Sequence, residues 1–295
     1  MTISPQNSPA QPAGRAGGGR GRGGRPISTT VQRTERLSPT MVRIVVTGPD
    51  LARFAANEYS DAYVKLVFLR PGVDYPRPLD LAAVREQFAA SDWPQQRTYT
   101  VRAWDPAALE LTIDFVVHGD EGLAGPWARS AAAGDELLLQ GPGGGYLPDP
   151  AADWHLLIGD ESALPAIAAS LERLPATAVG QVLIEVHGAE QEQKLAGPDG
   201  VSVRWVHTGE GPLGEALVAA VAALTFPDGV VQAFVHGEAG VVKDLRRLLK
   251  LERGVPQAQL SISGYWRLGA DDETWRSVKG EWNRQIEQAE ASAGS

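Results

Sequence analysis

The sequence predicts two domains of different fold class, an N-terminal antiparallel six-stranded β-barrel and a C-terminal Rossmann-like parallel α/β sheet. Three observations predict this. The chain has 295 residues, enough for two hydrophobic cores. Up to residue 140, short segments rich in β-branched and aromatic residues follow one another without a long helix. After residue 150 strands and helices alternate, which is typical of a parallel sheet covered on both faces.

Residues 1–26 are predicted to form a disordered tail. They are mostly Gly, Pro, Ser, Gln and Arg and offer almost nothing apolar to bury. The glycine–arginine run at residues 17–25 resembles an RGG tract that contacts RNA or acidic surfaces. A flexible extension without a specific function is the favoured interpretation.

The barrel is predicted over residues 27–148. Turn residues separate its strands, which are expected at 30–37, 41–47, 62–69, 95–104, 109–118 and 135–140. Short helices are expected at 79–89 and 123–132. A glycine loop at 141–145 ends the domain, and Leu147-Pro148-Asp149-Pro150 is the predicted linker.

The α/β domain is predicted over residues 149–270. Its strands are expected at 154–158, 182–186, 201–206, 230–235 and 259–263, with helices at 164–174, 213–223 and 241–251. Ligands of such sheets bind beyond the carboxyl ends of the strands, where Gly159-Asp160 and Gly237-Glu238 fall. Residues 271–295 are predicted to form a C-terminal helix and tail, with Trp275 and Trp282 on one helix face.

Composition excludes several classes of protein. A net charge of −9 and a pI near 5.1 argue against specific nucleic-acid binding by the folded part. The absence of cysteine excludes disulfides, thiolate zinc sites and cysteine-ligated iron–sulfur clusters. The five histidines stand singly, so no metal site is predicted. The longest apolar stretch, 216–224, is too short to span a bilayer, and no secretory signal is evident. We therefore expect a cytoplasmic protein without membrane insertion.

The most informative motif is Arg97-Thr98-Tyr99-Thr100-Val101-Arg102. In a strand, alternation places Arg97, Tyr99 and Val101 on one face and the other three residues on the opposite face. A guanidinium fork suits phosphate, a tyrosine offers a flat ring, and a threonine adds a hydroxyl. This set suits a nucleotide with a planar ring, such as a flavin. The six residues alone fit an ordinary surface strand with two solvated arginines equally well.

Further motifs follow in a fixed order. They are His118-Gly119-Asp120, Trp127-Ala128, Gly141-Pro142, the run from Gly159 to Ile167, Gly237-Glu238 and Gly264-Tyr265-Trp266-Arg267. In this order, over residues 28–270, the chain resembles the siderophore-interacting protein family, FAD-containing ferric-siderophore reductases related to the ferredoxin reductases. The resemblance implies that the barrel binds FAD and the α/β domain binds NAD(P)H. It implies that electrons from NADPH or NADH, or from a ferredoxin, reach a siderophore-bound Fe(III), which leaves as Fe(II).

Carried over residue by residue, the resemblance implies four groups of site residues. The cofactor-binding group is Arg97, Tyr99, Thr100, Val101, His118, Gly119, Asp120, Gly122, Ala124, Trp127, Asp160, Ser162 and Ala163. Gly237 and Glu238 are implied for the electron donor, Tyr265 and Trp266 for covering the flavin, and Lys65 and Arg267 for the substrate. No residue is assigned acid–base chemistry or a metal ion.

The chain departs from the family pattern at four positions, one of which is Gly143, where the family often has a basic residue. Leu123 replaces the usual Pro and Gly125 the usual Ser, which leaves the diphosphate contact there to backbone amides. Ser162 stands where the family has Thr, and we also expect it to cap the following helix.

Each single residue also has a structural interpretation. His118 could cap a carbonyl at a strand end, and Glu238 could simply begin a helix. Tyr265 and Trp266 could be an ordinary buried pair, and Lys65 could extend over the barrel with its ammonium in water.

Two other functions are open. One is a general flavin or ferredoxin-type reductase with a different acceptor, and the other is a non-catalytic protein that binds a ferric chelate. The chain has no Gly-x-Gly-x-x-Gly at its strand-to-helix turns, which disfavours a dehydrogenase of the usual Rossmann type. The sequence does not choose between the donors, among the siderophores, or among oligomeric states.

Overall fold

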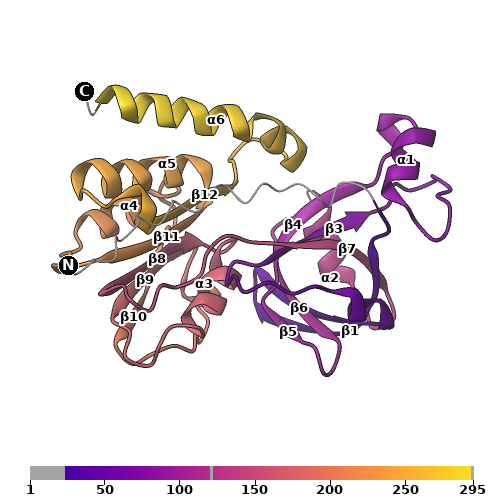
Figure 1. The fold of residues 1–295 in the computed structure, drawn as a ribbon, viewed down its shortest axis with the longest axis horizontal. Helices are drawn as coiled ribbons and strands as arrows, with labels where there is room; N and C mark the ends of the chain where they lie inside the picture. The colour runs from indigo at the N-terminus through magenta and orange to yellow at the C-terminus, as the bar shows by residue number, and fades with distance from the viewer. Residues whose placement is uncertain (1–23, 120–121, 294–295) are drawn as a thin grey trace, which may run out of the picture.

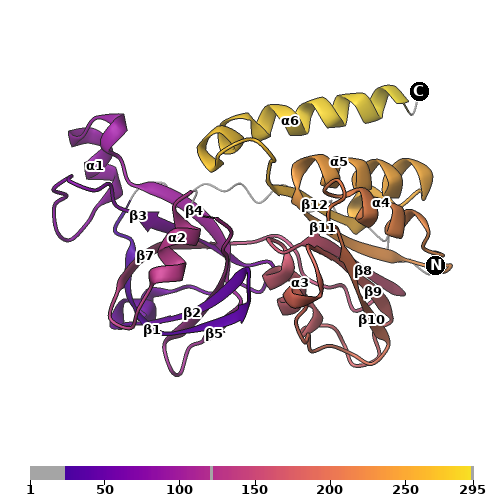
Figure 2. The ribbon, with the colours of Figure 1, turned by 180° about the vertical axis from the view of Figure 1, so that it is seen from behind.

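The computed structural model describes residues 24–119 and 122–293, which form two halves side by side (Figures 1 and 2). One half is a seven-stranded antiparallel sheet and the other a five-stranded parallel sheet. The predicted fold class is therefore confirmed. A long C-terminal helix runs over the helices of the parallel half, and its first turns approach the antiparallel half (Figure 1).

The antiparallel sheet curls into a barrel. Its strands are β1 (Ile27–Ser38), β2 (Met41–Thr47), β3 (Tyr63–Phe68), β4 (Gln95–Thr100), β5 (Ala103–Asp105), β6 (Glu110–Val116) and β7 (Glu136–Gly143), in the spatial order β4-β3-β7-β1-β2-β6-β5. The two edge strands, β4 and β5, follow one another in the chain, so the sheet must turn back on itself. The ring of Tyr99 on β4 contacts Phe115 on β6 at 4.4 Å between centroids, which packs the two ends of the sheet together.

The strand expected at 95–104 is divided into β4 and β5, so the barrel has one more strand than predicted. The backbone changes partners at the division. The Val101 N–H donates to Ala62, beside β3, whereas the Arg102 N–H donates to Thr112 on β6. Two short helices accompany the barrel: α1 (Leu81–Gln87), whose first turn is capped by the Asp80 carboxylate, and α2 (Ala124–Ser130).

The parallel sheet contains β8 (Trp154–Asp160), β9 (Gly180–Val186), β10 (Val201–His207), β11 (Val231–Glu238) and β12 (Leu260–Trp266), in the order β10-β9-β8-β11-β12. Its helices are α3 (Leu164–Leu171), α4 (Glu215–Ala222) and α5 (Ala239–Arg247), and α5 is followed by a π-helix at Leu248–Glu252. Along β8, Leu156 and Ile158 pack with residues of α4 and α5, and Leu157 packs with residues of α3. Helices therefore cover both faces, and the three central strands β8, β9 and β11 are almost fully buried, whereas the edge strand β10 is mostly exposed.

Strand order reverses between β8 and β11, because β9 lies on one side of β8 and β11 on the other. A reversal of this kind leaves a crevice beyond the carboxyl ends of the two strands, where ligands bind in open α/β sheets. Asp160 ends β8 and Glu238 ends β11, so both predicted site positions lie at this switch point.

Helix α6 (Asp272–Ala293) is anchored on the parallel half. Trp275 is fully buried, with only 1% of its surface exposed, and its indole lies against Gly264 of β12. The Lys279 ammonium donates to the Ser263 hydroxyl at 2.9 Å, and Arg246 of α5 pairs with Glu290 at 2.5 Å. Anchors therefore occur along most of the helix.

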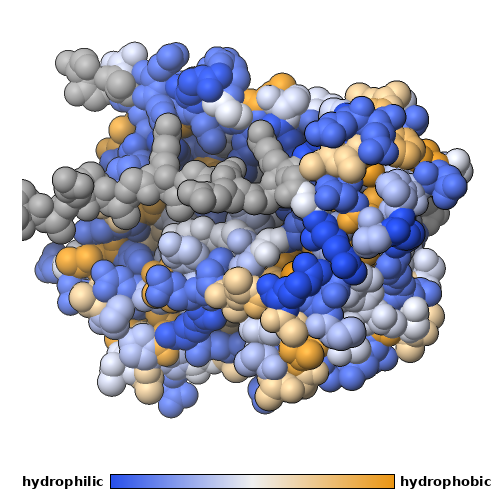
Figure 3. Space-filling view, turned by 45° about the vertical axis from the view of Figure 1, so that its right-hand side comes forward, coloured by the Kyte–Doolittle hydropathy of each residue, from blue (hydrophilic) through white to orange (hydrophobic). Residues whose placement is uncertain are grey.

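Of the tail predicted to be disordered, residues 1–26, the part up to residue 23 lies outside the described residues. The boundaries at 148/149 and 270/271 stay predictions; β7 ends at Gly143 and β8 begins at Trp154. Within residues 24–119 and 122–293, no helix is both long enough and apolar enough to cross a bilayer. On the face shown in Figure 3, hydrophobic residues are scattered among hydrophilic ones.

Candidate flavin site and its surroundings

The predicted site residues Tyr99 and Val101, which alternation places on one face, both lie on the core side of the barrel. Tyr99 lies opposite Val64 of β3 and packs against the barrel core, as does the buried Val101. Burial raises the pKa of the Tyr99 phenol, so the ring is neutral and largely apolar in its surroundings. Thr100 is buried at the end of the strand.

A series of aromatic rings connects β4 with α2. From Tyr99 it passes to Phe115, then to Trp127 of α2 at 5.6 Å, and on to Phe68 of β3 at 5.8 Å. Edge-to-face and tilted pairs of this kind favour a fixed packing of the rings. Tyr99 of β4 and Trp127 of α2 are therefore brought together through Phe115, and the buried Ala124 of α2 belongs to the same barrel core.

Three of the described residues between β6 and α2, namely His118, Gly119 and Gly122, are exposed. His118 and Gly119 follow β6 on the surface. Gly119 and Gly122 have positive φ angles of 55° and 83°, a conformation that glycine adopts without strain. Asp120 lies outside the described residues.

Arg97 has partners that the sequence did not reveal. Its two terminal nitrogens lie 2.5 and 3.0 Å from the carboxylate oxygens of Glu273, and one of them lies 3.5 Å from Asp272. Both acids belong to the first turn of α6. Burial opposes ionisation of Glu273, but its bonds to Arg97 outweigh burial, so its pKa lies below its usual range. The fork of Arg97 is thus engaged by anions.

Asp160 organises the carboxyl end of the parallel sheet. Its carboxylate accepts hydrogen bonds from the Ser162 N–H (2.9 Å) and hydroxyl (2.5 Å), from the Glu238 N–H (2.8 Å) and from the Trp266 indole (2.7 Å). Burial raises the pKa of this carboxyl despite these four donors. One side chain therefore joins the ends of β8, β11 and β12.

The prediction that Ser162 caps the next helix is wrong. Helix α3 begins at Leu164 after Ala163, and no side chain caps it. The Ser162 hydroxyl donates to Asp160 instead, because the aspartate accepts both the backbone N–H and the hydroxyl two residues on. Ala163 itself is fully buried in this turn.

Glu238 begins α5, as the alternative interpretation stated. Its carboxylate accepts the Val241 N–H at 2.9 Å as an N-cap and also the Leu268 N–H at 3.1 Å. Gly237 has φ +145°, and a Cβ there would lie 2.7 Å from an oxygen of Asp160. Only glycine fits this position, so Gly237 permits the close approach of β11 to Asp160.

The aromatic residues after β12 differ from each other in environment. Tyr265 is half-buried and meets His236 edge to face, with its pKa raised by burial and by neighbouring acids. Trp266 is 36% exposed and is fixed through its bond to Asp160. Arg267 is exposed. Trp266 is therefore the more accessible ring of the two.

Lys65 lies half-buried on β3, opposite Thr98 of β4 and Gln140 of β7. It points away from the barrel core, since its neighbours Val64 and Leu66 are core residues. Tyr63 is two residues before it on the same face. A Cβ at Gly143 would lie 2.3 Å from the Tyr63 ring, so the ring fills the space that a side chain at 143 would need.

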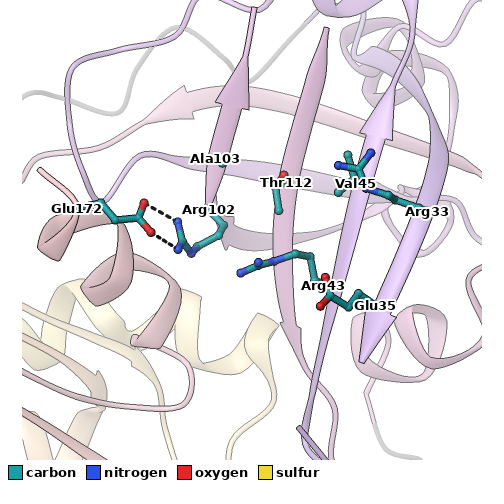
Figure 4. Close-up of a pocket in the computed structure, with 8 residues that line it drawn as sticks. All are labelled: Arg33, Glu35, Arg43, Val45, Arg102, Ala103, Thr112 and Glu172. Atoms are coloured by element: carbon teal, nitrogen blue, oxygen red, sulfur yellow. Dashed lines mark hydrogen bonds and ion pairs between the residues drawn. The ribbon is translucent and has the colours of Figure 1, made fainter. Parts of the chain in front are cut away.

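A cavity of about 390 Å³ lies between the barrel and the end of α3 (Figure 4). Arg102 crosses it to Glu172 with two hydrogen bonds of 3.0 and 2.5 Å. None of the predicted site residues lines it; the lining is Arg33, Glu35, Arg43, Val45, Arg102, Ala103, Thr112 and Glu172. The second arginine of the motif thus joins the two halves of the molecule.

A buried carboxyl beside the glycine loop yields a pH test. Asp61 accepts the N–H groups of Gly145 and Tyr146, both at 2.8 Å and both on the same oxygen. Burial raises its pKa against the effect of these bonds. The folded chain therefore holds this proton more tightly than the unfolded chain, and stability falls as pH rises from about 4 through the raised pKa.

In Asp61→Asn the amide oxygen can keep both hydrogen bonds while the position no longer titrates. We expect the variant to gain stability relative to the wild type as pH rises from about 4 to 7, by about 1.4 kcal/mol for each unit by which the native pKa is raised. Urea unfolding of both proteins across this pH interval measures the difference. A difference that does not change with pH would contradict the assignment.

Two family models match the chain, one over the antiparallel half and the other over the parallel half. Residues 30–146 match the model of the siderophore-interacting FAD-binding domain, and residues 152–269 match that of the siderophore-interacting protein. Ferric vibriobactin reductase ViuB of Vibrio cholerae is 34% identical over 84% of this chain and 91% of its own length. The NADPH-dependent ferric-chelate reductase of Escherichia coli is 32% identical over 80% and 91%.

The chain belongs to the siderophore-interacting protein family. The siderophore-interacting protein SipS of Aeromonas hydrophila has the same fold, with a TM-score of 0.73 and 32% identity over 88% of this chain and 99% of that one. A ferredoxin–NADP⁺ reductase of Plasmodium falciparum, at 11% identity and a TM-score of 0.60, shares the fold alone. The barrel is thus the FAD-binding domain of a siderophore-interacting protein, as the motifs predicted.

The residues present fit FAD. A guanidinium fork already engaged by two carboxylates, a neutral tyrosine ring and a threonine hydroxyl occupy one strand. In the part of the chain that the structure describes, no group of three or more His, Asp or Glu side chains could hold a metal ion.

Proposed function

We propose that this protein is an FAD-dependent ferric-siderophore reductase that takes electrons from NADPH or NADH and releases iron as Fe(II). The observation that carries the proposal is the guanidinium–tyrosine–threonine set on β4, within a domain that matches the siderophore-interacting FAD-binding domain. The printed names of two relatives, a ferric vibriobactin reductase and an NADPH-dependent ferric-chelate reductase, support the substrate and the donor. A ferredoxin is a less well supported donor.

Bound FAD supplies the ability to accept two electrons together and to give them up singly. We assign Arg97 to the diphosphate, because a guanidinium can donate two parallel hydrogen bonds to the oxygens of one phosphate group. Tyr99 and Thr100 are assigned to the ring system, and Val101 supports them from the core. His118, Gly119, Asp120, Gly122, Ala124 and Trp127 are assigned to the diphosphate side and its wall.

The carboxyl end of the parallel sheet is assigned to the meeting of cofactor and donor. Asp160, Ser162 and Ala163 shape the turn after β8, and Asp160 fixes Trp266 by a hydrogen bond of 2.7 Å. Gly237 and Glu238 shape the corresponding turn after β11, where the donor would enter at the switch point. Tyr265 and Trp266 would cover the flavin ring and keep water from it.

Iron enters as the cargo of its chelate, so the protein supplies a docking surface rather than ligands. Lys65 and Arg267 are assigned to that surface, because many ferric chelates are anionic and the chain carries a net charge of −9. A local positive charge offsets the repulsion that such a chelate would otherwise meet.

Anaerobic mixing tests the proposal directly. The purified protein, loaded with FAD, is mixed with NADH or NADPH, and the loss of flavin absorbance is followed. A panel of ferric siderophores is then added. Return of the absorbance with formation of Fe(II) supports the reductase. Loss of absorbance that only other acceptors reverse would identify a general flavin reductase, and chelate binding without electron transfer would identify a binding protein.

Lys65→Ala should lower kcat/KM for anionic ferric chelates about three- to tenfold at low ionic strength and weaken the salt dependence, because steering by charge is lost. Flavin reduction by the donor should not change. Lys243→Ala, which removes the same charge from the exposed face of α5, is the matched control. Equal losses for neutral and anionic chelates would remove Lys65 from the docking surface.

A further inference from the structure

Helix α6 holds Arg97 by an ion pair. The Arg97 side chain is only 14% exposed, and both of its terminal nitrogens face Glu273 as a two-point fork. This is the geometry in which a guanidinium binds a carboxylate or a phosphate group. The same two nitrogens cannot form that fork with Glu273 and with a diphosphate at once.

The first turns of α6 are tied to β4 by more than this pair. Gln95 donates to Glu273 at 3.1 Å, and Arg276 donates to the backbone oxygen of Gln96, also at 3.1 Å. The contacts on the parallel half begin with Trp275 and continue to Glu290. Because Asp272 and Glu273 precede Trp275, their contacts with Arg97 can be given up while the anchors are kept.

Replacing the two carboxylates by a diphosphate would leave the negative charge beside Arg97 similar. Asp272 and Glu273 together present two carboxylates to one arginine, and a diphosphate presents at least two negative charges. Asp272 is also 3.6 Å from Arg276, so it has a second cation within its own helix. Neither the arginine nor the aspartate would lose every partner of opposite charge.

We propose that the first turn of α6 competes with the diphosphate of FAD for Arg97, so that FAD binding and the pairing of Glu273 with Arg97 exclude each other. The first turn of α6 then acts as a strap, paired with Arg97 when FAD is absent and released from Arg97 when FAD binds. This inference rests on the assignment of Arg97 to the diphosphate made above.

Glu273→Gln is the test, because it removes the charge that competes and keeps the size of the side chain. Glu273 is 44% exposed in its side chain, and Asp271 still caps the helix through the Thr274 N–H at 2.7 Å, so the helix start is retained. We expect FAD to bind the cofactor-free variant roughly three- to tenfold more tightly, the range that loss of a partly exposed competing ion pair allows. Quenching of flavin fluorescence measures both dissociation constants.

Riboflavin and Glu281→Gln serve as controls. Riboflavin has no diphosphate, so its affinity should be the same in the wild type and in Glu273→Gln. Glu281, on the same helix, pairs with Arg284 and not with β4, and its substitution makes the same change in net charge. Glu281→Gln should leave the affinity for FAD unchanged. This control separates the loss of the Glu273–Arg97 pair from the effect of a lower negative charge on α6.

Hydrogen exchange gives a second readout. In the wild type, the amides of residues 275–279 should exchange faster once FAD is bound, since the turn before them has lost its contact with β4. Unchanged or weaker FAD binding in Glu273→Gln, an equal gain for riboflavin, or slower exchange with FAD would each overturn the strap. If Arg97→Ala left FAD affinity unchanged, the assignment of Arg97 itself would fail; if only Glu273→Gln had no effect, the strap alone would fail.

Discussion

Replacing Arg97 by alanine should raise the dissociation constant of FAD about ten- to a hundredfold. The variant loses a charge-assisted, two-point contact with the diphosphate, worth roughly 1.5–3 kcal/mol. The dissociation constant of FAD for Arg97→Lys should lie between those of Arg97→Ala and the wild type, because lysine keeps the charge but lacks the planar fork. Flavin retained after dialysis and fluorescence titration of the cofactor-free proteins measure the effect.

Arg77→Ala is the matched control for Arg97→Ala. Arg77 lies in the same half of the molecule and pairs with Glu136 at 3.2 Å, but its side chain is 55% exposed. Its substitution removes one positive charge without touching β4, so FAD affinity should stay within about twofold of the wild type. Full FAD occupancy of Arg97→Ala at low flavin concentration would count against the role of Arg97.

Trp275→Ala should lower the free energy of unfolding by about 3–5 kcal/mol, the usual cost of truncating a fully buried aromatic side chain. Its indole packs on Gly264 of β12, and its ring centroid lies 5.2 Å from that of Trp282. The substitution therefore removes the contacts that hold α6 on the parallel half. The ring nitrogen has no hydrogen-bond partner, so Trp275→Phe should cost clearly less. Urea unfolding followed by circular dichroism measures all three proteins.

Trp93→Ala is the comparison for Trp275→Ala, because Trp93 is 36% exposed and lies on the barrel side. It should cost about 1–2 kcal/mol, clearly less than Trp275→Ala, since about a third of its surface stays in water in the folded chain. A cost of Trp275→Ala as small as that of Trp93→Ala, about 1–2 kcal/mol, would show that α6 contributes little to the stability of the parallel half.

Local patterns predicted most of the elements well. Segments rich in β-branched and aromatic residues between turn residues predicted the barrel strands, so β2 matches the predicted range, and β1, β3 and β6 differ from it only at their ends. The central strands of the parallel sheet, β8, β9 and β11, were equally easy to predict, because both of their faces are covered and their residues are mostly apolar. The ordered motifs then led to the family, which the comparisons confirmed.

Local patterns failed where a residue has a choice of partners. Ser162 has the residue type and the position of a helix cap, yet its hydroxyl donates to Asp160. The strand containing Arg97 divides at Val101 because the backbone there moves from β3 to β6, and both alternatives look the same in sequence. In each case two good hydrogen-bonding arrangements compete, and the packing of neighbouring elements selects one.

By itself the sequence determined the two fold classes and the residue types that β4 presents, because periodicity and residue type act over a few neighbouring residues. Only the tertiary structure decided that Asp160 joins three strand ends, that Arg102 crosses to Glu172, and that Glu273 holds Arg97. Arg97 and Glu273 are 176 residues apart. Contacts at that separation depend on how two cores dock, and docking geometry leaves no periodic trace along the chain.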